Sequence, residues 1–131
     1  MSTKFSTSKL GTKYDKQFIL DNDNKYHNIL HMLRKYASNK HCADCNSKDN
    51  SWCSVNIGVF LCIHCAQLHR GIGTHISKVK SCSGTYLWHP DEIERMKALG
   101  NYEATKKYGG FRNDGKPPTK KWITDKYSNH S

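Results

Sequence analysis

The sequence of 131 residues contains no long run of apolar residues. Polar residues follow Met1, so we expect no signal peptide, and no stretch approaches the roughly 20 apolar residues that a membrane-spanning helix needs. Internal repeats and low-complexity tracts are absent as well. The G-x-x-x-x-G-K-[ST] loop that cradles nucleotide phosphates does not occur, so that class of nucleotide site is not expected. The length and these absences together indicate one domain in a reducing compartment.

Acidic residues are also few. Asp and Glu number 11 against 21 Lys and Arg, which gives a formal net charge of +10 and an isoelectric point near 9.4. A chain of this charge is attracted to anionic surfaces, whether nucleic acid, acidic lipid or the acidic face of a protein. The charge does not choose among these partners, and an ordinary solvated lysine surface would give the same value. The partner must therefore be inferred from motifs.

Cysteine, by contrast, is plentiful. Six cysteines accompany a hydrophobic content of 36%, so the small core would gain from a crosslink. In a reducing compartment that crosslink is expected to be a metal rather than a disulfide. Two C-x2-C pairs supply four thiolates, namely Cys42, Cys45, Cys62 and Cys65. Four thiolates complete a tetrahedron, so we predict one structural Zn2+ ion with no open position for a reacting water.

Other residues near the two pairs could be considered as ligands. His41, His64 and His69 lie close to them in sequence and stay open as alternatives. Cys53 and Cys82 have no partner at ligand spacing, so small buried core residues are the simpler interpretation.

The pattern of apolar and turn residues predicts an α+β fold. The β-prone run between the thiol pairs predicts a hairpin over 52–61, and 76–82 suits a third strand. Helical spacing and capping residues predict helices over 23–37, 63–70, 90–99, 102–108 and 119–127. We therefore expect a small zinc-bound β-sheet of about three strands flanked by about five helices. This domain would span 23–131, with its four-cysteine zinc finger at 42–65, and residues 1–22 would form a flexible N-terminal arm.

Arg70 follows the last cysteine by little more than one helical turn, in the segment Cys65-Ala-Gln-Leu-His-Arg70. Spacing alone allows a surface arginine that merely suits the end of a helix. The complete pattern, C-x2-C-x16-C-x2-C-x4-R from Cys42 to Arg70, resembles that of the Arf GTPase-activating protein (ArfGAP) domains. The run from Trp52 to Cys62 resembles the tryptophan-led hairpin of that family, and residues 68–80 resemble its arginine helix and following strand. The resemblance extends over about 23–127.

The resemblance implies a GTPase-activating protein for Arf-family small GTPases in their GTP-bound form. It implies that Arg70 is the catalytic arginine finger, held in place by the zinc site and supplied in trans to the GTPase. On this interpretation the chain is an activator and not itself an enzyme. Arf-type GTPases are anchored to lipid, so we expect a cytoplasmic protein, peripheral at the Golgi or other Arf-bearing membranes in vesicle trafficking. The anionic membrane surface would then attract the domain only indirectly.

A further set of residues flanks Arg70 or matches a family position and could contact the GTPase. Ordinary packing or surface exposure stays open as the alternative for each of them: Trp52, Ile72, His75, Lys78 and Lys80. One segment departs from the family pattern, because residues 81–88 lack the usual aspartate and are one residue longer. This difference could alter the preference among Arf-type GTPases.

Three alternative functions stay open on the sequence. A zinc-finger module that binds nucleic acid would suit the positive charge, but residues 66–70 contain a single arginine where a basic recognition helix is required, so no nucleic-acid partner is expected. A purely structural zinc module of the Ring type would need about eight interleaved ligands. A domain that binds Arf without activating it would have the same zinc site.

Overall fold

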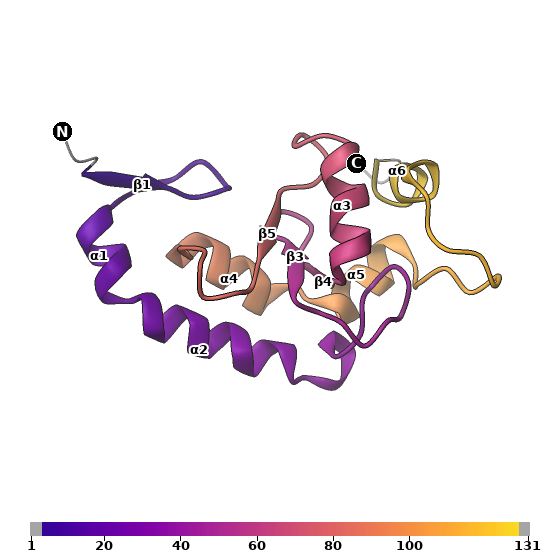
Figure 1. Cartoon of the computed structure of the whole chain (residues 1–131), viewed down its shortest axis with the longest axis horizontal. Helices are drawn as coiled ribbons and strands as arrows, with labels where there is room; N and C mark the ends of the chain where they lie inside the picture. Colours follow the sequence, from indigo (N-terminus) through magenta and orange to yellow (C-terminus); the bar gives the residue numbers. More distant parts are fainter. Residues whose placement is uncertain (1–3, 129–131) are drawn as a thin grey trace.

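The computed structural model describes residues 4–128. A three-stranded antiparallel sheet lies between two groups of helices, and a two-stranded hairpin begins the described chain (Figure 1). Within this part of the chain, no helix combines the length and the hydrophobicity that a bilayer span requires. The elements in chain order are β1 (Phe5–Thr7), β2 (Lys13–Asp15), α1 (Lys16–Asp21), α2 (Asp23–Arg34), the short 3-10 helix η1 (Ala37–Asn39), β3 (Trp52–Ser54), β4 (Val59–Leu61), α3 (Ile63–Gly71), β5 (Val79–Ser81), α4 (Pro90–Ala98), α5 (Asn101–Tyr108) and α6 (Lys120–Ser128).

The sheet has the strand order β4-β3-β5 and separates two hydrophobic clusters. Successive side chains of a strand point to opposite faces, and β4 follows this rule with apolar residues on both sides. Phe60 packs with the cluster formed by α2 and α4, whereas Val59 and Leu61 pack with the cluster that contains α3, α5 and α6. Because both faces are covered, the sheet fixes the position of α3 relative to the rest of the domain.

The predicted fold class is confirmed, with a three-stranded sheet among helices. Helical spacing correctly located α2, whose buried residues are Tyr26, Leu30 and Leu33, although the helix ends at Arg34 rather than near residue 37. Thr119 caps α6 as expected, since its Oγ1 accepts the Trp122 amide at 3.1 Å. The third strand is shorter than predicted and occupies only β5.

Gly58 lets the β3–β4 turn approach the corner between α4 and α5. Its φ of +87° favours glycine, and its carbonyl accepts the Gly100 amide at 2.8 Å. A Cβ at this position would overlap the side chain of Leu99. The turn therefore requires glycine for both its conformation and its packing.

The segment before α2 has more secondary structure than the sequence suggested. Residues 5–21 form the β1–β2 hairpin and a sixth helix, α1, whereas we had expected a flexible arm. The mobility of this segment and the domain limits stay predictions. The strands of this hairpin contain only one apolar residue each, so the sequence shows no β-prone run there. The contacts that hold the hairpin come from α4, 83 residues away.

Glu92 is the buried residue to which the hairpin is attached. Its side chain is fully buried at the start of α4, where Oε2 accepts the backbone N–H of Lys9 at 2.6 Å and Oε1 accepts the ammonium of Lys80 at 2.6 Å. Burial alone would raise the pKa of Glu92, but hydrogen bonding from His89 and the charge of Lys80 outweigh it and hold the pKa below its ordinary value. The ionised carboxylate therefore joins the hairpin to β5.

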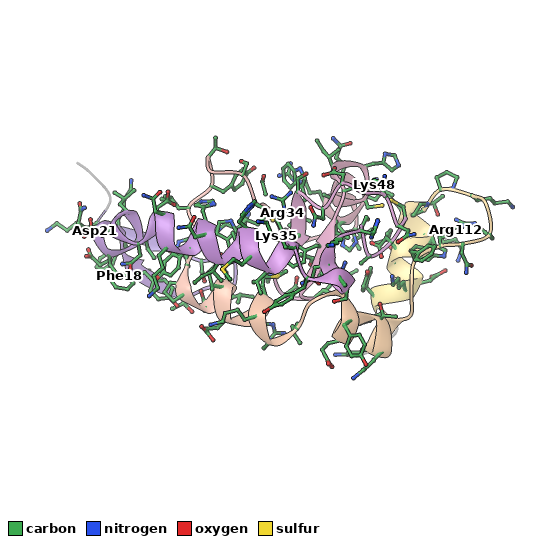
Figure 2. All side chains as sticks on the ribbon, turned by 90° about the horizontal axis from the view of Figure 1, so that it is seen from below. Phe18, Asp21, Arg34, Lys35, Lys48 and Arg112 are labelled. Atoms are coloured by element: carbon green, nitrogen blue, oxygen red, sulfur yellow. The ribbon has the colours of Figure 1, made fainter. Side chains whose placement is uncertain are left out.

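The molecule is elongated. Figure 2 places Phe18 and Asp21 at one end and Arg112, in the loop before α6, at the opposite end. The sheet and α3 lie between these ends (Figure 1).

We predict that Glu92→Gln lowers the free energy of unfolding by about 3 kcal/mol at pH 7, because it leaves the buried Lys80 ammonium without its counter-charge. Urea unfolding measures the loss. Glu94→Gln is the matched control on the same helix, since the exposed Glu94–Lys97 pair should contribute less than about 1 kcal/mol. Because the folded pKa of Glu92 is depressed, its contribution is present above the unfolded pKa of about 4.3 and disappears as pH falls through the folded value. An equal loss in both variants would contradict this role.

Candidate metal centre and arginine helix

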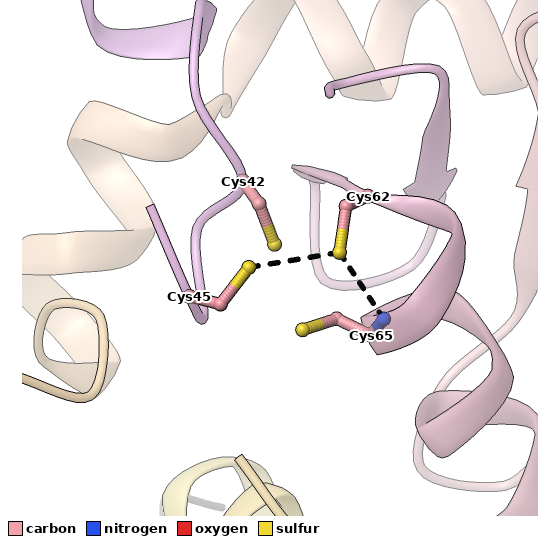
Figure 3. Close-up of side chains that lie close together, drawn as sticks. All are labelled: Cys42, Cys45, Cys62 and Cys65. Carbon is pink, nitrogen blue, oxygen red and sulfur yellow. Dashed lines mark hydrogen bonds between the residues drawn. The ribbon is translucent and has the colours of Figure 1, made fainter. Parts of the chain in front are cut away.

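Four cysteine side chains meet at the beginning of α3 (Figure 3). Cys42 and Cys45 lie in the loop between η1 and β3, Cys62 is the N-cap of α3, and Cys65 lies in its first turn. Their four Sγ atoms lie within 4.8 Å of one another, and those of Cys45 and Cys62 are 3.6 Å apart. All four thiols are free of disulfides. The predicted ligands are therefore brought together.

The geometry of this cluster fits a tetrahedral metal. Zinc–sulfur bonds of about 2.3 Å in a regular tetrahedron place sulfur atoms about 3.8 Å apart, close to the observed Cys45–Cys62 separation. Asn46, with a φ of +63°, turns the chain just after the first pair. The cluster can hold a metal ion without rearrangement of the fold.

The alternative ligands lie elsewhere. His64 is exposed, and His69 is fully buried with both ring nitrogens engaged by Asp44 and Ser77. Among the described residues the ligand cluster contains neither of them, nor His41. Cys53 and Cys82 belong to the core cluster on the other face of the sheet.

A buried carboxylate connects the first cysteine pair to two helices. Asp44 is fully buried, and it accepts hydrogen bonds from His69 of α3 at 2.7 Å, from Lys126 of α6 at 2.8 Å and from the Tyr127 hydroxyl. Burial alone would raise its pKa, but His69 and Lys126 outweigh that effect and hold the pKa below the ordinary value. The loop between Cys42 and Cys45 is thus attached to α3 by a contact that needs no metal.

The polar connection continues from α3 to the sheet. The other ring nitrogen of His69 lies 2.7 Å from the hydroxyl of Ser77, which donates to Ser54 Oγ at 2.7 Å. Ser54 donates in turn to Asn56 Oδ1 at 3.0 Å, and that oxygen also accepts the Lys78 amide. These bonds fix the segment after α3 against the β3–β4 turn.

His69 was expected only as an alternative metal ligand, and Asp44 was not predicted as a site residue. The spacing of Cys65 and His69 could have indicated that His69 is buried, because residues four apart lie on the same face of a helix. A histidine that shares the inward face with a metal ligand is buried and needs a polar partner. The identity of that partner depends on the tertiary fold.

Arg70 lies on the outward face of α3. Its neighbours Ala66 and His69 are buried, whereas Arg70 itself is exposed. The guanidinium carbon lies 4.8 Å from the centre of the Trp52 ring, and such a contact contributes about 0.5–1 kcal/mol at an exposed site. On the other side of Arg70 is a hollow of about 350 Å³, lined by Lys9, Arg70, Thr74, Ser77, Lys78 and Val79. The backbone of Arg70 belongs to the packed helix α3, and its exposed side chain lies beside this hollow.

The other predicted interface residues have different surroundings. Trp52 and Ile72 are half-buried and pack against the core, His75 is exposed, and Lys78 is half-buried beside the hollow. Lys80 is different, because only 3% of it is exposed and its ammonium is paired with Glu92. The proposal that Lys80 contacts a partner is therefore not supported by its position. All three residues of β5 are buried, because both faces of the sheet are covered.

The segment that departs from the family pattern folds back on the domain. Trp88 is fully buried and its indole N–H donates to the Ser81 carbonyl at 3.0 Å. Tyr86 packs edge-on against Trp52, with ring centres 6.0 Å apart. This segment thus buttresses the tryptophan on which Arg70 lies. Its effect on activity stays a prediction.

Comparison with known proteins relates the whole of this site to one family. Residues 27–131 match the sequence model of the ArfGap family, described as "Putative GTPase activating protein for Arf". A relative in Arabidopsis thaliana, named "Probable ADP-ribosylation factor GTPase-activating protein AGD15", is 46% identical over 77 residues, which cover 59% of this chain and 33% of the relative. Stromal membrane-associated protein 1 of Mus musculus is 49% identical over 76 residues, covering 58% of this chain and 17% of the relative. The chain thus spans a third or less of the length of these relatives.

The fold recurs in solved structures. The ArfGap domain of HIV-1 Rev binding protein superimposes with a TM-score of 0.71, over 87% of this chain and 91% of that chain. The sequence identity is 20%, so this likeness concerns the fold alone.

One expectation from the sequence is wrong. We had expected an activator that is not an enzyme, but the matching family and the Arabidopsis relative are named for GTPase activation, which is an activity that stimulates hydrolysis. The chain is therefore grouped with proteins of enzyme-like activity.

We predict that His69→Ala lowers the free energy of unfolding by about 3 kcal/mol, because it removes a buried donor to Asp44 and leaves Ser77 without that partner. Chemical denaturation with the metal-loaded protein measures the change. His64→Ala is the control, since this exposed histidine lies on the same helix, and its loss should stay within about 0.5 kcal/mol. Equal stability of the two variants would show that the Asp44–His69 contact does not hold α3.

Proposed function

The chain belongs to the Arf GTPase-activating protein family, and from this membership we propose that it stimulates GTP hydrolysis by a GTP-bound Arf-family small GTPase. Because the chain covers only part of its relatives, the activity and the partner are proposals for this domain. The observation that carries them is an exposed arginine on a helix that is fixed from two directions. Asp44 holds the middle of α3 through His69, and a metal in the cysteine cluster would hold its first turn.

Arg70 is the residue we propose to act on the reaction. During phosphoryl transfer, negative charge is spread over the transferring group, and a guanidinium that is already positioned stabilises this charge without reorganisation of water. The GTPase binds the nucleotide, and this domain contributes the arginine in trans. The backbone of Arg70 needs no further ordering, because α3 is fixed. Only its side chain must leave Trp52 and enter the nucleotide site.

The metal we propose is a single Zn2+ ion with a structural role. Four thiolates would fill its coordination sphere and leave no position for substrate or a reacting water. The ion would connect the loop of Cys42 and Cys45 to the first turn of α3. When bound, it supplies stability to the fold, and the catalytic chemistry stays with the arginine.

We propose that the domain works in the cytoplasm, peripheral at the Golgi or at other membranes that carry Arf-type GTPases. The formal charge of +10 suits a location near the anionic cytoplasmic leaflet. The membrane contact would be indirect, through the lipid-anchored GTPase.

We predict that Arg70→Ala and Arg70→Lys both remain folded and lose most of the stimulation, by about 10³-fold or more. Lysine fails because an ammonium lacks the planar fork of donors. Single-turnover hydrolysis on a panel of GTP-loaded Arf-family GTPases measures the rates, with Lys97→Ala as a control that removes an exposed charge from α4. Full activity of Arg70→Lys would contradict the arginine finger. A wild-type domain that binds but does not stimulate would support the non-activating alternative.

A second prediction concerns the metal. Cys62→Ala should lose the bound zinc and the folded state together, because zinc binding in small modules contributes about 10–16 kcal/mol of apparent free energy. Metal analysis and circular dichroism of the purified variant measure both properties. Cys82→Ala, a buried cysteine outside the cluster, should retain one zinc ion per chain. An active, well-folded Cys62→Ala protein would show that the metal is dispensable.

A further inference from the structure

The β1–β2 hairpin lies outside the residues that match the family, which begin at residue 27. Hydrogen bonds nevertheless attach it to the start of α4. The backbone N–H of Lys9 donates to Glu92 at 2.6 Å, the hydroxyl of Ser8 donates to Asp91 at 2.7 Å, and Ser6 Oγ lies 2.8 Å from His89 Nε2. Figure 1 shows the hairpin on the same side of α2 as α3. The hairpin is therefore fixed to the domain that carries Arg70.

Glu92 places the tip of the hairpin beside β5. One carboxylate oxygen accepts the backbone N–H of Lys9, and the other accepts the ammonium of Lys80, a buried residue of β5. The two segments are thus held on either side of one buried group. Since the backbone of Lys9 makes the attachment, its exposed side chain is free for another contact.

That side chain lines the same hollow as Arg70. The hollow of about 350 Å³ has three cationic residues in its wall, namely Lys9, Arg70 and Lys78, and no carboxylate. Lys78 donates to the carbonyl of Thr74 at 2.9 Å, which leaves two of its three ammonium hydrogens for other acceptors. Three like charges around a concave surface create a local positive potential that favours an anionic group. The hairpin supplies one of these charges.

We propose that the β1–β2 hairpin is part of the surface that binds the GTPase, and that Lys9 and Lys78 receive a carboxylate side chain of the GTPase beside Arg70. This inference rests on the proposed function, because a surface that brings its nucleotide to Arg70 must cover the adjoining hollow. Arg70 would contact the reacting phosphate, and the two lysines would bind the protein surface around it. Lys9 is then a specificity residue that the family pattern does not contain.

The test compares charge changes within the hairpin. Lys9→Glu, Lys9→Ala and the control Lys13→Glu are assayed with a GTP-loaded Arf-family GTPase at varied concentrations of the domain. We expect Lys9→Glu to lower kcat/KM about three- to tenfold, mainly through KM, and Lys9→Ala to lower it less. Lys13 is exposed on the same hairpin but does not line the hollow, so Lys13→Glu should stay within about twofold. The Lys9 effect should shrink at about 0.5 M salt, where screening is strong.

The outcomes separate this inference from the proposed function. Wild-type stimulation that is unchanged in both Lys9 variants would overturn the role of the hairpin and leave the activity in place. Absence of wild-type stimulation on the whole panel would overturn both. Titration of the domain with pyrophosphate alone provides a further arm, because pyrophosphate binding that Lys9→Glu abolishes would assign the hollow to free phosphates instead of a carboxylate. Thermal unfolding of each variant shows whether it is folded. If Lys9→Glu lowers stability, the kcat/KM of Lys9→Ala tests the role of the Lys9 charge instead.

Discussion

The buried carboxylate of Asp44 holds together the loop of the first cysteine pair and the helices α3 and α6. Asp44 lies in the loop between the first two cysteines, and its donors come from α3 and α6. Because a buried carboxylate without partners costs several kcal/mol, the loop and the two helices form one unit. A metal in the cysteine cluster would join the same loop to the same helix a second time. A bound metal would therefore add a second attachment between the arginine helix and this loop.

These attachments explain how an exposed side chain can be well placed. The backbone at Arg70 is fixed through Cys65 and His69, which lie on the inner face of α3. The guanidinium has only a weak contact with Trp52, which edge-on packing of Tyr86 supports. A change of rotamer, without movement of the helix, would carry the charge to a nucleotide held by a partner. The second buried carboxylate, Glu92, places the hairpin and its lysine beside this site in the same manner.

The sequence predicted those features that depend on local spacing. The cysteine pairs and the hairpin between them are encoded within residues 42–65, and the helices with an apolar face were located to within a few positions. Long-range partners were not predictable. His69 meets Asp44 across 25 residues, and Lys9 meets Glu92 across 83. Lys80 was expected at the surface because a single charged residue in a short strand gives no sign of a buried counter-charge. The β1–β2 hairpin was missed because its strands, residues 5–7 and 13–15, contain only one apolar residue each, whereas β4 is apolar throughout.

The most direct test is the structure of this domain bound to an Arf-family GTPase that is loaded with GDP and aluminium fluoride, a mimic of the transferring phosphoryl group. We expect α3 and the Asp44–His69 contact to be unchanged in the complex. The guanidinium of Arg70 should have left Trp52 and should contact the fluoride or the leaving phosphate oxygens. A complex in which Arg70 remains on Trp52, or faces solvent away from the nucleotide, would contradict the central claim that this arginine acts in trans.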